Sequence, residues 1–169
     1  MWPFKTTKSA TRTAGIGAVA AAAIALAVTG LKPDEGLVLK PYFDVVGVET
    51  VCYGETQGIQ HKTYTKAECE QLLAARVTSD YYKPMAQCIP GFTSLPIPTQ
   101  SATTRLAYNI GVGAACKSSA AKLLAKGHIR EACNAFLLYN KGRIKGKLTE
   151  IRGLTLRRQR EQAECLKGA

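Results

Sequence analysis

A long stretch of small and apolar residues without charge lies near the N-terminus, where residues 13–31 read TAGIGAVAAAAIALAVTGL. At helical rise this stretch spans roughly 28 Å, which is about the thickness of the hydrocarbon core of a bilayer. Lys5, Lys8 and Arg12 precede it, and basic residues on this side favour an orientation with the N-terminus in the cytoplasm. The pattern therefore predicts a helix in the inner membrane, with the downstream chain on the outer side.

Three interpretations of this segment compete. A cleaved signal peptide has a similar basic start, and Ala23-x-Ala25 or Ala25-x-Ala27 resembles a cleavage site. A buried core helix is the second, although the Ala-rich stretch lacks the polar stripe that a surface helix needs. The third is an uncleaved anchor that holds weakly, because eight of its residues are alanine and three are glycine, which contribute little apolar area to insertion. We favour the weak anchor, which is able to leave the bilayer.

Beyond the anchor, the pattern changes to short elements separated by proline and glycine. Pro33 suits the first position of a helix, and Lys40-Pro41 then ends that helix. Asp34 and Glu35 are expected in its first turn, near the positive end of the helix dipole.

The remaining pattern predicts one small sheet followed by a helical lobe. Residues 42–60 hold Val, Tyr, Thr and Phe punctuated by glycines, which is typical of a hairpin. Thr65-x-x-Glu68 is a capping box and begins a helix that runs to about Tyr82. After a loop with three prolines, further helices are predicted near residues 100–110, 118–125, 129–139 and 155–166. The fold class is therefore α+β, with a small hairpin near the start and helices after it.

Composition restricts the partners of the chain. Its 169 residues suffice for one domain with a short extension, and 23 Lys and Arg against 12 Asp and Glu give a net charge of +11. Such a charge favours a polyanion, and the scattered basic residues carry no nucleic-acid-binding signature, so we expect no nucleic acid. Neither the cysteines nor the two histidines show the close spacing of metal ligands, so we expect no metal and no cofactor.

The chain has six dispersed cysteines, none of them in a C-x-x-C pair. An even number in this arrangement predicts up to three disulfides in an oxidising compartment, in agreement with export. Fifteen pairings are possible, and the spacing selects none of them. The alternative is a set of buried thiols in a cytosolic protein.

Glu35, Asp44 and Thr50 form the constellation with the clearest chemical potential. Cleavage of a glycosidic bond needs one carboxyl that is protonated and another that is ionised. A helix end followed by a turn into a sheet can place two carboxyls in different environments, and that difference separates their pKa values. The structural alternative makes Glu35 a helix-terminal residue and Asp44 a turn residue.

A series of motifs in fixed order surrounds these residues: Glu35-Gly36-Leu37, Tyr42-Phe43-Asp44, Gly47, Thr50, Tyr53-Gly54, Thr56, Tyr108-Asn109-Ile110-Gly111, Gly153-Leu154, Arg157-Arg158 and Glu161. The series resembles the phage lysozymes of glycoside hydrolase family 24, over roughly residues 33–166. The resemblance implies a lysozyme-like fold and a muramidase that cuts peptidoglycan between N-acetylmuramic acid and N-acetylglucosamine. The enzyme is expected to need no cofactor and to act as a monomer.

The resemblance also implies a role for each site residue. Glu35 corresponds to the general acid, Asp44 to the carboxylate that activates water or stabilises charge, and Thr50 to the residue that positions the attacking water. The family is regarded as inverting, so the two carboxyls are expected to leave room for a water. The alternative is a catalytically silent protein that binds peptidoglycan and has kept the fold.

The chain is most similar to the subgroup with a signal-anchor-release N-terminus. This similarity implies an anchor at residues 1–31 and a catalytic domain at residues 32–169. The enzyme would be inactive while tethered to the host inner membrane, with its catalytic domain in the periplasm, and active in the periplasm after release. We also expect the released segment to pack against the catalytic domain.

Several residues outside the constellation carry further expectations. Cys52, where many relatives have glycine, is expected to be half of a disulfide, with a role in tuning the site as the alternative. Arg157 or Arg158 is expected to pair with Glu35 or a neighbour. Tyr108 and Asn109 either face the cleft or belong to the core. Neither His61 nor His128 has a catalytic signature, and both are expected at the surface or in packing.

Overall fold

The structure is a computed structural model that describes the backbone of residues 9–169 and the side chains of residues 17–169. Its longest element is helix α1 (Ser9–Glu35), which contains the predicted apolar segment in one continuous run. The 19 residues Gly17–Glu35 are long and apolar enough to cross a membrane. Basic residues 5 and 8, used above to predict orientation, lie outside the described residues.

The predicted helix from Pro33 to Pro41 is wrong. Pro33 lies inside the last turn of α1, and strand β1 occupies Val38–Phe43. The helix has already begun in the apolar segment, and Gly36 ends it in the left-handed conformation (φ 73°), with its N–H donated to the Lys32 carbonyl at 3.3 Å. Glu35 therefore lies at the negative end of a helix dipole, the reverse of the predicted position.

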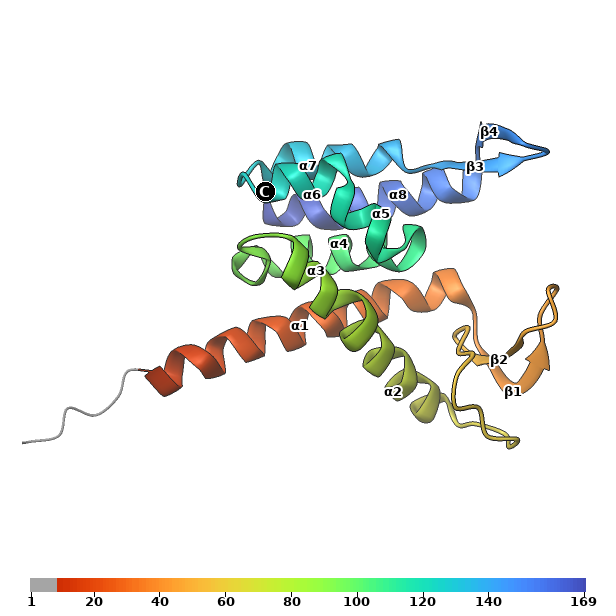
Figure 1. The fold of residues 1–169 in the computed structure, drawn as a ribbon. Coiled ribbons are helices and arrows are strands. Elements are labelled where there is room, and N and C mark those ends of the chain that lie inside the picture. The colour runs from red at the N-terminus through yellow and green to blue at the C-terminus, as the bar shows by residue number, and fades with distance from the viewer. Residues whose placement is uncertain (1–8) are drawn as a thin grey trace, which may run out of the picture.

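The hairpin predicted after this helix is confirmed. Strand β1 pairs antiparallel with β2 (Glu49–Cys52), with Tyr42 opposite Thr50 and Phe43 opposite Glu49. A bulge interrupts the register between Val38 and Tyr42. The hairpin extends from the end of α1, at one end of the molecule (Figure 1).

A helical lobe makes up most of the remaining chain, as predicted. Its elements are α2 (Lys66–Arg76), a π-helical stretch (Val77–Tyr82), α3 (Lys83–Cys88), α4 (Ile97–Ile110), α5 (Val112–Lys117), α6 (Ser119–Leu124), α7 (Ile129–Ala135) and α8 (Arg152–Cys165), with short 3₁₀ turns at Phe92–Ser94, Phe136–Leu138 and Leu166–Gly168. The capping box is present: Thr65 accepts from the Glu68 N–H, and the Glu68 carboxylate accepts from the Thr65 N–H.

A second hairpin, of strands β3 (Lys141–Ile144) and β4 (Lys147–Glu150), was not predicted. Its sequence has no run of β-branched or aromatic residues, so the pattern carried little strand signal. The turn specifies it instead, because Lys145 and Gly146 both take positive φ (48° and 81°), as a two-residue hairpin turn requires.

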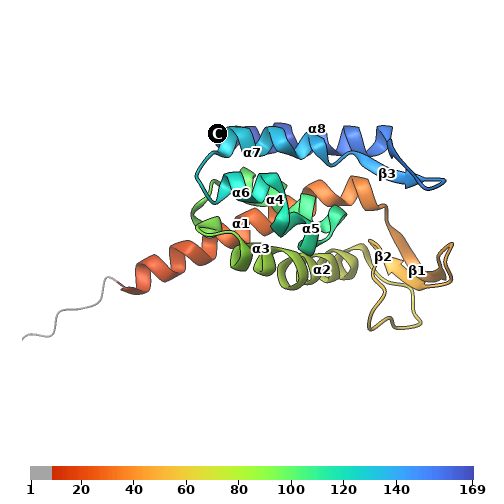
Figure 2. The ribbon, with the colours of Figure 1, turned by 45° about the horizontal axis from the view of Figure 1, so that its top comes forward.

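Helix α1 packs against the body of the protein, which is the packing predicted for the N-terminal segment. Ala23, Ala27 and Leu31 recur every four residues, and all three are fully buried. In two views α1 runs beside α4, while its N-terminal turns extend beyond the lobe (Figures 1 and 2). Gly30 allows the close approach, because a Cβ there would lie 2.6–2.7 Å from three guanidinium atoms of the buried Arg105 on α4.

Three disulfides join segments that are distant in sequence: Cys52–Cys69, Cys88–Cys116 and Cys133–Cys165. The prediction of up to three disulfides is confirmed. The first links β2 to α2, and the last links α7 to α8. Each closes a loop of intermediate length and is expected to add roughly 2–4 kcal/mol to the stability of the fold.

One ion pair lies entirely in the interior. Arg158 Nη2 donates to Glu161 Oε1 at 2.7 Å, and both side chains have no exposed surface. Burial raises the pKa of Glu161 to about 7, although the charge of Arg158 opposes the rise. Burial also lowers the pKa of Arg158.

We predict that Gly30→Ala destabilises the fold by about 1–3 kcal/mol, because the new methyl group displaces a guanidinium held in the interior. Gly17→Ala is the matched control, since Gly17 is in the same helix but has no atom within 4 Å of its Cβ position. Urea unfolding should show the loss for Gly30→Ala and an unchanged or raised midpoint for Gly17→Ala. Equal behaviour of the two variants would contradict the close packing of α1.

We predict that the free energy of unfolding falls as pH rises from about 4.5 to about 7. The folded protein binds the Glu161 proton more tightly than the unfolded chain does, so the unfolded state gains relative stability across this window. Glu161→Gln should be less stable, since Arg158 loses its partner, but should lack this decline. If the free energy of unfolding changed with pH in the same way for both proteins, the raised pKa of Glu161 would be contradicted.

Candidate active site

Asp34, in the last turn of α1, is surrounded by three arginines. Its Oδ2 lies 3.6 Å from Arg105 Nη2 and 3.5 Å from Arg157 Nε, and its Oδ1 accepts from Arg160. The side chain is almost fully buried at 6% exposure, so these charges are only weakly screened by water. Since Arg105 belongs to α4 and the other two arginines to α8, the cluster ties α1 to both helices. We call it the Asp34 cluster.

Glu35 is placed by the same cluster. Arg157, which contacts Asp34 through Nε, also lies with Nη1 3.1 Å from Glu35 Oε1. The expectation that one of the two consecutive arginines pairs with Glu35 is thus confirmed for Arg157, while Arg158 pairs in the core. One guanidinium therefore bridges a buried carboxylate and a carboxylate that remains partly open, at 23% exposure.

Asp44 follows β1 and closes the turn of the first hairpin. Its Oδ1 accepts from the N–H groups of Val46 and Val48, each at 2.9 Å, and its own N–H is donated to the Val48 carbonyl. These bonds fix the orientation of the carboxylate within the turn. The role of turn residue, which the sequence left open, is therefore present in the structure, and the geometry leaves the second carboxylate oxygen free of these turn bonds.

Thr50 lies opposite Tyr42 in the hairpin and is buried. Its hydroxyl donates to the Val48 carbonyl at 3.0 Å. The backbone of Val48 therefore connects Asp44 and Thr50: its N–H binds the Asp44 carboxylate, and its carbonyl binds the Thr50 hydroxyl. The structure brings these two residues together within the hairpin and holds Glu35 by separate contacts at the end of α1.

A second set of polar residues near Glu35 surrounds Tyr108 on α4. The Tyr108 hydroxyl donates to the Tyr53 carbonyl at 3.4 Å, and Arg76 lies over its ring, 5.5 Å from the centroid. Burial raises the pKa of Tyr108 to about 12, and the negative charges of Glu35 and Glu55 add to the rise while Arg76 opposes it. Tyr108 thus lies among these three charged residues.

Glu55 is a residue that the sequence reasoning missed. Its carboxylate lies 4.0 Å from Arg76 Nη1, and burial raises its pKa, with Arg76 opposing the shift. The residue lies between Gly54 and Thr56 of the motif series, and this position is a signal that it belongs to the site. The spacing alone, however, does not distinguish a buried acid from an exposed one.

A cavity of about 460 Å³ opens beside the Asp34 cluster. Its lining includes Asp34, Asn109, Ile151, Leu156 and Arg157. Of the pair Tyr108 and Asn109, the second therefore faces a cavity, as one interpretation expected. The cavity lies against Arg157, the arginine that contacts Glu35.

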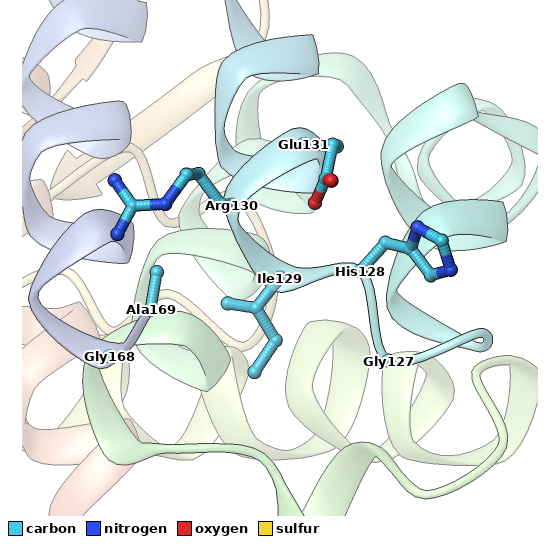
Figure 3. A pocket seen from close by; sticks show the side chains of 7 residues that line it. All are labelled: Gly127, His128, Ile129, Arg130, Glu131, Gly168 and Ala169. Atoms are coloured by element: carbon cyan, nitrogen blue, oxygen red, sulfur yellow. The ribbon is translucent and has the colours of Figure 1, made fainter.

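Two other hollows lie away from this cluster. One, at the start of α7 beside the C-terminus, is lined by His128, Arg130 and Glu131, and the first two side chains extend to opposite sides (Figure 3). It is at the end of the molecule opposite the hairpins (Figure 1). The other adjoins the first hairpin, where the exposed His61 Nδ1 lies 3.3 Å from Glu49 Oε1. Both histidines are at the surface, as expected.

Cys52 is the last residue of strand β2. It forms the disulfide with Cys69, as expected, and adopts a positive φ of 60°, a conformation that favours glycine. The disulfide fixes the strand that carries Thr50 to helix α2. Whether the bond also tunes the site remains a proposal from the sequence.

Comparison with known proteins places this arrangement in a family. The family model described as phage lysozyme matches residues 32–161. The chain belongs to the phage lysozyme family. An SAR-endolysin of bacteriophage PS119 is 34% identical over 173 residues, covering 94% of this chain and 96% of the relative. An SAR-endolysin of Pseudomonas phage phiKMV is 34% identical over 148 residues, covering 86% and 89%.

Solved structures agree with this membership. An endolysin from Escherichia coli O157:H7 phage FAHEc1 has a TM-score of 0.71 at 28% identity and covers 85% of this chain and 92% of its own. The fold is therefore lysozyme-like, mostly helical with a small hairpin sheet, as predicted. Membership of the phage lysozyme family identifies the chain as a glycoside hydrolase of the endolysin type.

We predict that Arg157→Gln lowers the activity on peptidoglycan by about tenfold to a hundredfold, because Glu35 loses the guanidinium that fixes its position. Arg160→Gln is the matched control, since within residues 17–169 Arg160 also contacts Asp34 but forms no ion pair with Glu35. It should retain activity within about threefold. Initial rates on purified peptidoglycan, with thermal midpoints recorded for both, decide the question; equal losses would rule out a specific role for Arg157.

Proposed function

We propose that this member of the phage lysozyme family is a muramidase that hydrolyses the β-1,4 bond between N-acetylmuramic acid and N-acetylglucosamine in peptidoglycan. The observation that supports it most is the placement of Glu35: a partly open carboxylate held by Arg157, beside a cavity and next to the hairpin that carries Asp44 and Thr50.

Each residue of this group has a proposed role. Glu35 acts as the general acid and delivers a proton to the oxygen of the leaving sugar. Asp44, held by two backbone N–H groups, activates the attacking water or stabilises positive charge at the sugar carbon. Thr50 positions that water. With the water between the carboxyls, the product would have inverted configuration at the anomeric carbon.

We also propose that α1 has two alternative environments. In the first, residues 1–31 anchor the chain in the host inner membrane, with the N-terminus in the cytoplasm and residues 32–169 in the periplasm. In the second, after release, the helix packs into the core as the structure describes. Support comes from its length and apolar composition, and from relatives that are SAR-endolysins.

Tethering would silence the enzyme because α1 cannot occupy both environments. Ala27 and Leu31 are fully buried in the fold, and Asp34 is clamped by α4 and α8. A helix held in the bilayer withdraws these contacts, so Arg157 no longer fixes Glu35. The membrane potential acts on flanking charges with about 2.3 kcal/mol per charge per 100 mV, so its collapse would trigger release of a marginal anchor.

We predict that Glu35→Gln abolishes peptidoglycan hydrolysis, with a loss of at least about a thousandfold, while the protein stays folded. Gln is close to Glu in size but cannot deliver the proton. Glu49→Gln, on β2 of the same hairpin, is the matched control and should retain activity. Reducing-end release measures the rates. Full activity in Glu35→Gln would remove it from the mechanism, and peptidoglycan binding without turnover in the unaltered protein would favour the silent binding protein.

We predict that the membrane-bound form retains Met1, as an uncleaved anchor requires. Intact-mass analysis of protein extracted from membranes measures this directly. A mass matching cleavage after Ala25 or Ala27 would instead show a signal peptide, which would leave the muramidase proposal intact but exclude regulation by release.

A further inference from the structure

The hairpin of β3 and β4 carries a concentration of positive charge. Lys141, Arg143, Lys145 and Lys147 are all exposed, and none of the four forms an ion pair with another side chain of residues 17–169. The hairpin has one acid, Glu150, and its carboxylate accepts from the Thr155 hydroxyl at 3.0 Å. We call Lys141–Glu150 the cationic hairpin.

The cationic hairpin is held in a defined direction. At its base the Ile151 N–H donates to the Asn140 carbonyl at 3.0 Å, and the Asn140 amide donates to Thr155 on α8 at 3.2 Å. Ile151 also covers Gly142 so closely that a Cβ there would lie 2.6 Å from its Cδ1. The charges are therefore presented by a built element, although an isolated hairpin has little stability of its own.

The cationic hairpin stands beside the candidate active site. Ile151, the residue that follows β4, lines the same cavity as Asp34 and Arg157. Both hairpins project from the same end of the molecule, with the C-terminal end of α1 between them (Figures 1 and 2). From Ile151 to the turn at Lys145 is about 20 Å of extended chain. The positive charges thus lie within about 20 Å of the cavity, a distance that a short peptide can span.

We propose that the cationic hairpin binds the carboxylates of the peptide side chains of peptidoglycan and holds the strand against Glu35. This inference rests on the proposed function and names the part of the substrate that is recognised away from the sugars. Four cations without ion-pair partners suit a flexible peptide with several carboxylates. Each cation can pair with a different carboxylate, and each such pair contributes a modest binding free energy. The glycan is uncharged along most of its length, so the peptides supply the anionic partner.

The pattern of side chains disfavours a bilayer as the partner. The pairing places Arg143 opposite Leu148 on one face and Ile144 opposite Lys147 on the other. Each face therefore combines one apolar residue with a cation directly across from it. A membrane-surface element needs an apolar face separate from its charged face, and this hairpin has none.

The test measures binding of the full-length released protein to insoluble peptidoglycan by co-sedimentation, with Glu35→Gln in all proteins to limit cleavage. One variant changes Lys141, Arg143, Lys145 and Lys147 to Gln. The matched control changes three lysines and one arginine on α5–α7: Lys117, Lys122, Lys126 and Arg130, all exposed. We expect about a tenfold weaker Kd for the hairpin variant and a change below twofold for the control.

A second comparison alters the peptidoglycan instead of the hairpin, so its main readout does not depend on how the hairpin variant folds. Peptidoglycan with its carboxylates converted to amides should bind the protein with the unaltered hairpin about tenfold more weakly, and should bind the two variants with equal strength. Equal binding of native and amidated peptidoglycan, or of both variants to native peptidoglycan, would overturn the proposal. So would a hairpin variant that loses binding only to phosphatidylglycerol vesicles, since the partner would then be a membrane.

These readouts separate the two proposals. Binding is measured without turnover, so a failure of Glu35 as the general acid would leave the hairpin result interpretable. Conversely, a hairpin variant with unchanged binding would leave the assignment of Glu35 untouched.

Discussion

The arrangement of this protein depends on one buried carboxylate. Asp34, at the end of α1, meets arginines from α4 and α8, and one of them, Arg157, continues to Glu35. Withdrawing all of these arginines together, as undocking of α1 does, leaves a charge in the interior without compensation, which is strongly destabilising. The packing of α1 and the position of Glu35 are therefore coupled: the contacts that hold the helix in the fold are the contacts that orient the carboxylate beside the cavity.

The composition of α1 serves both of its proposed environments. Alanine and glycine give a weak driving force for insertion, because they bury little apolar area in lipid. In the folded protein the same small residues permit close approach, with Ala23 and Ala27 fully buried and Gly30 against Arg105. A helix rich in leucine would hold better in a bilayer but would not fit against α4. The marginal anchor and the tightly packed core helix are thus two consequences of one sequence.

Much of the fold was predictable where local signals were strong. The capping box at Thr65, the first hairpin and the later helices follow from side-chain chemistry that acts within a few residues. The helix at Pro33 was mispredicted because proline at a helix start resembles proline tolerated in a last turn, and only the packing of α1 distinguishes them. The motifs located Glu35, Asp44 and Thr50. The clamp on Asp34 by Arg105 and Arg160, and the pairing of the largely buried Glu55 with Arg76, depend on contacts between residues far apart in sequence. Disulfide pairing was open for the same reason.

The central claim is that docking of α1 creates the active arrangement. The most direct measurement compares peptidoglycan hydrolysis by one preparation in two states: soluble without detergent, and embedded in lipid vesicles with residues 32–169 outside and accessible to soluble glycan fragments. Soluble fragments remove the difference in access to the wall. The account predicts activity in the soluble state and at least about a hundredfold less in the embedded state. Equal rates in both states would contradict it, because Glu35 would then be in place without the docked helix.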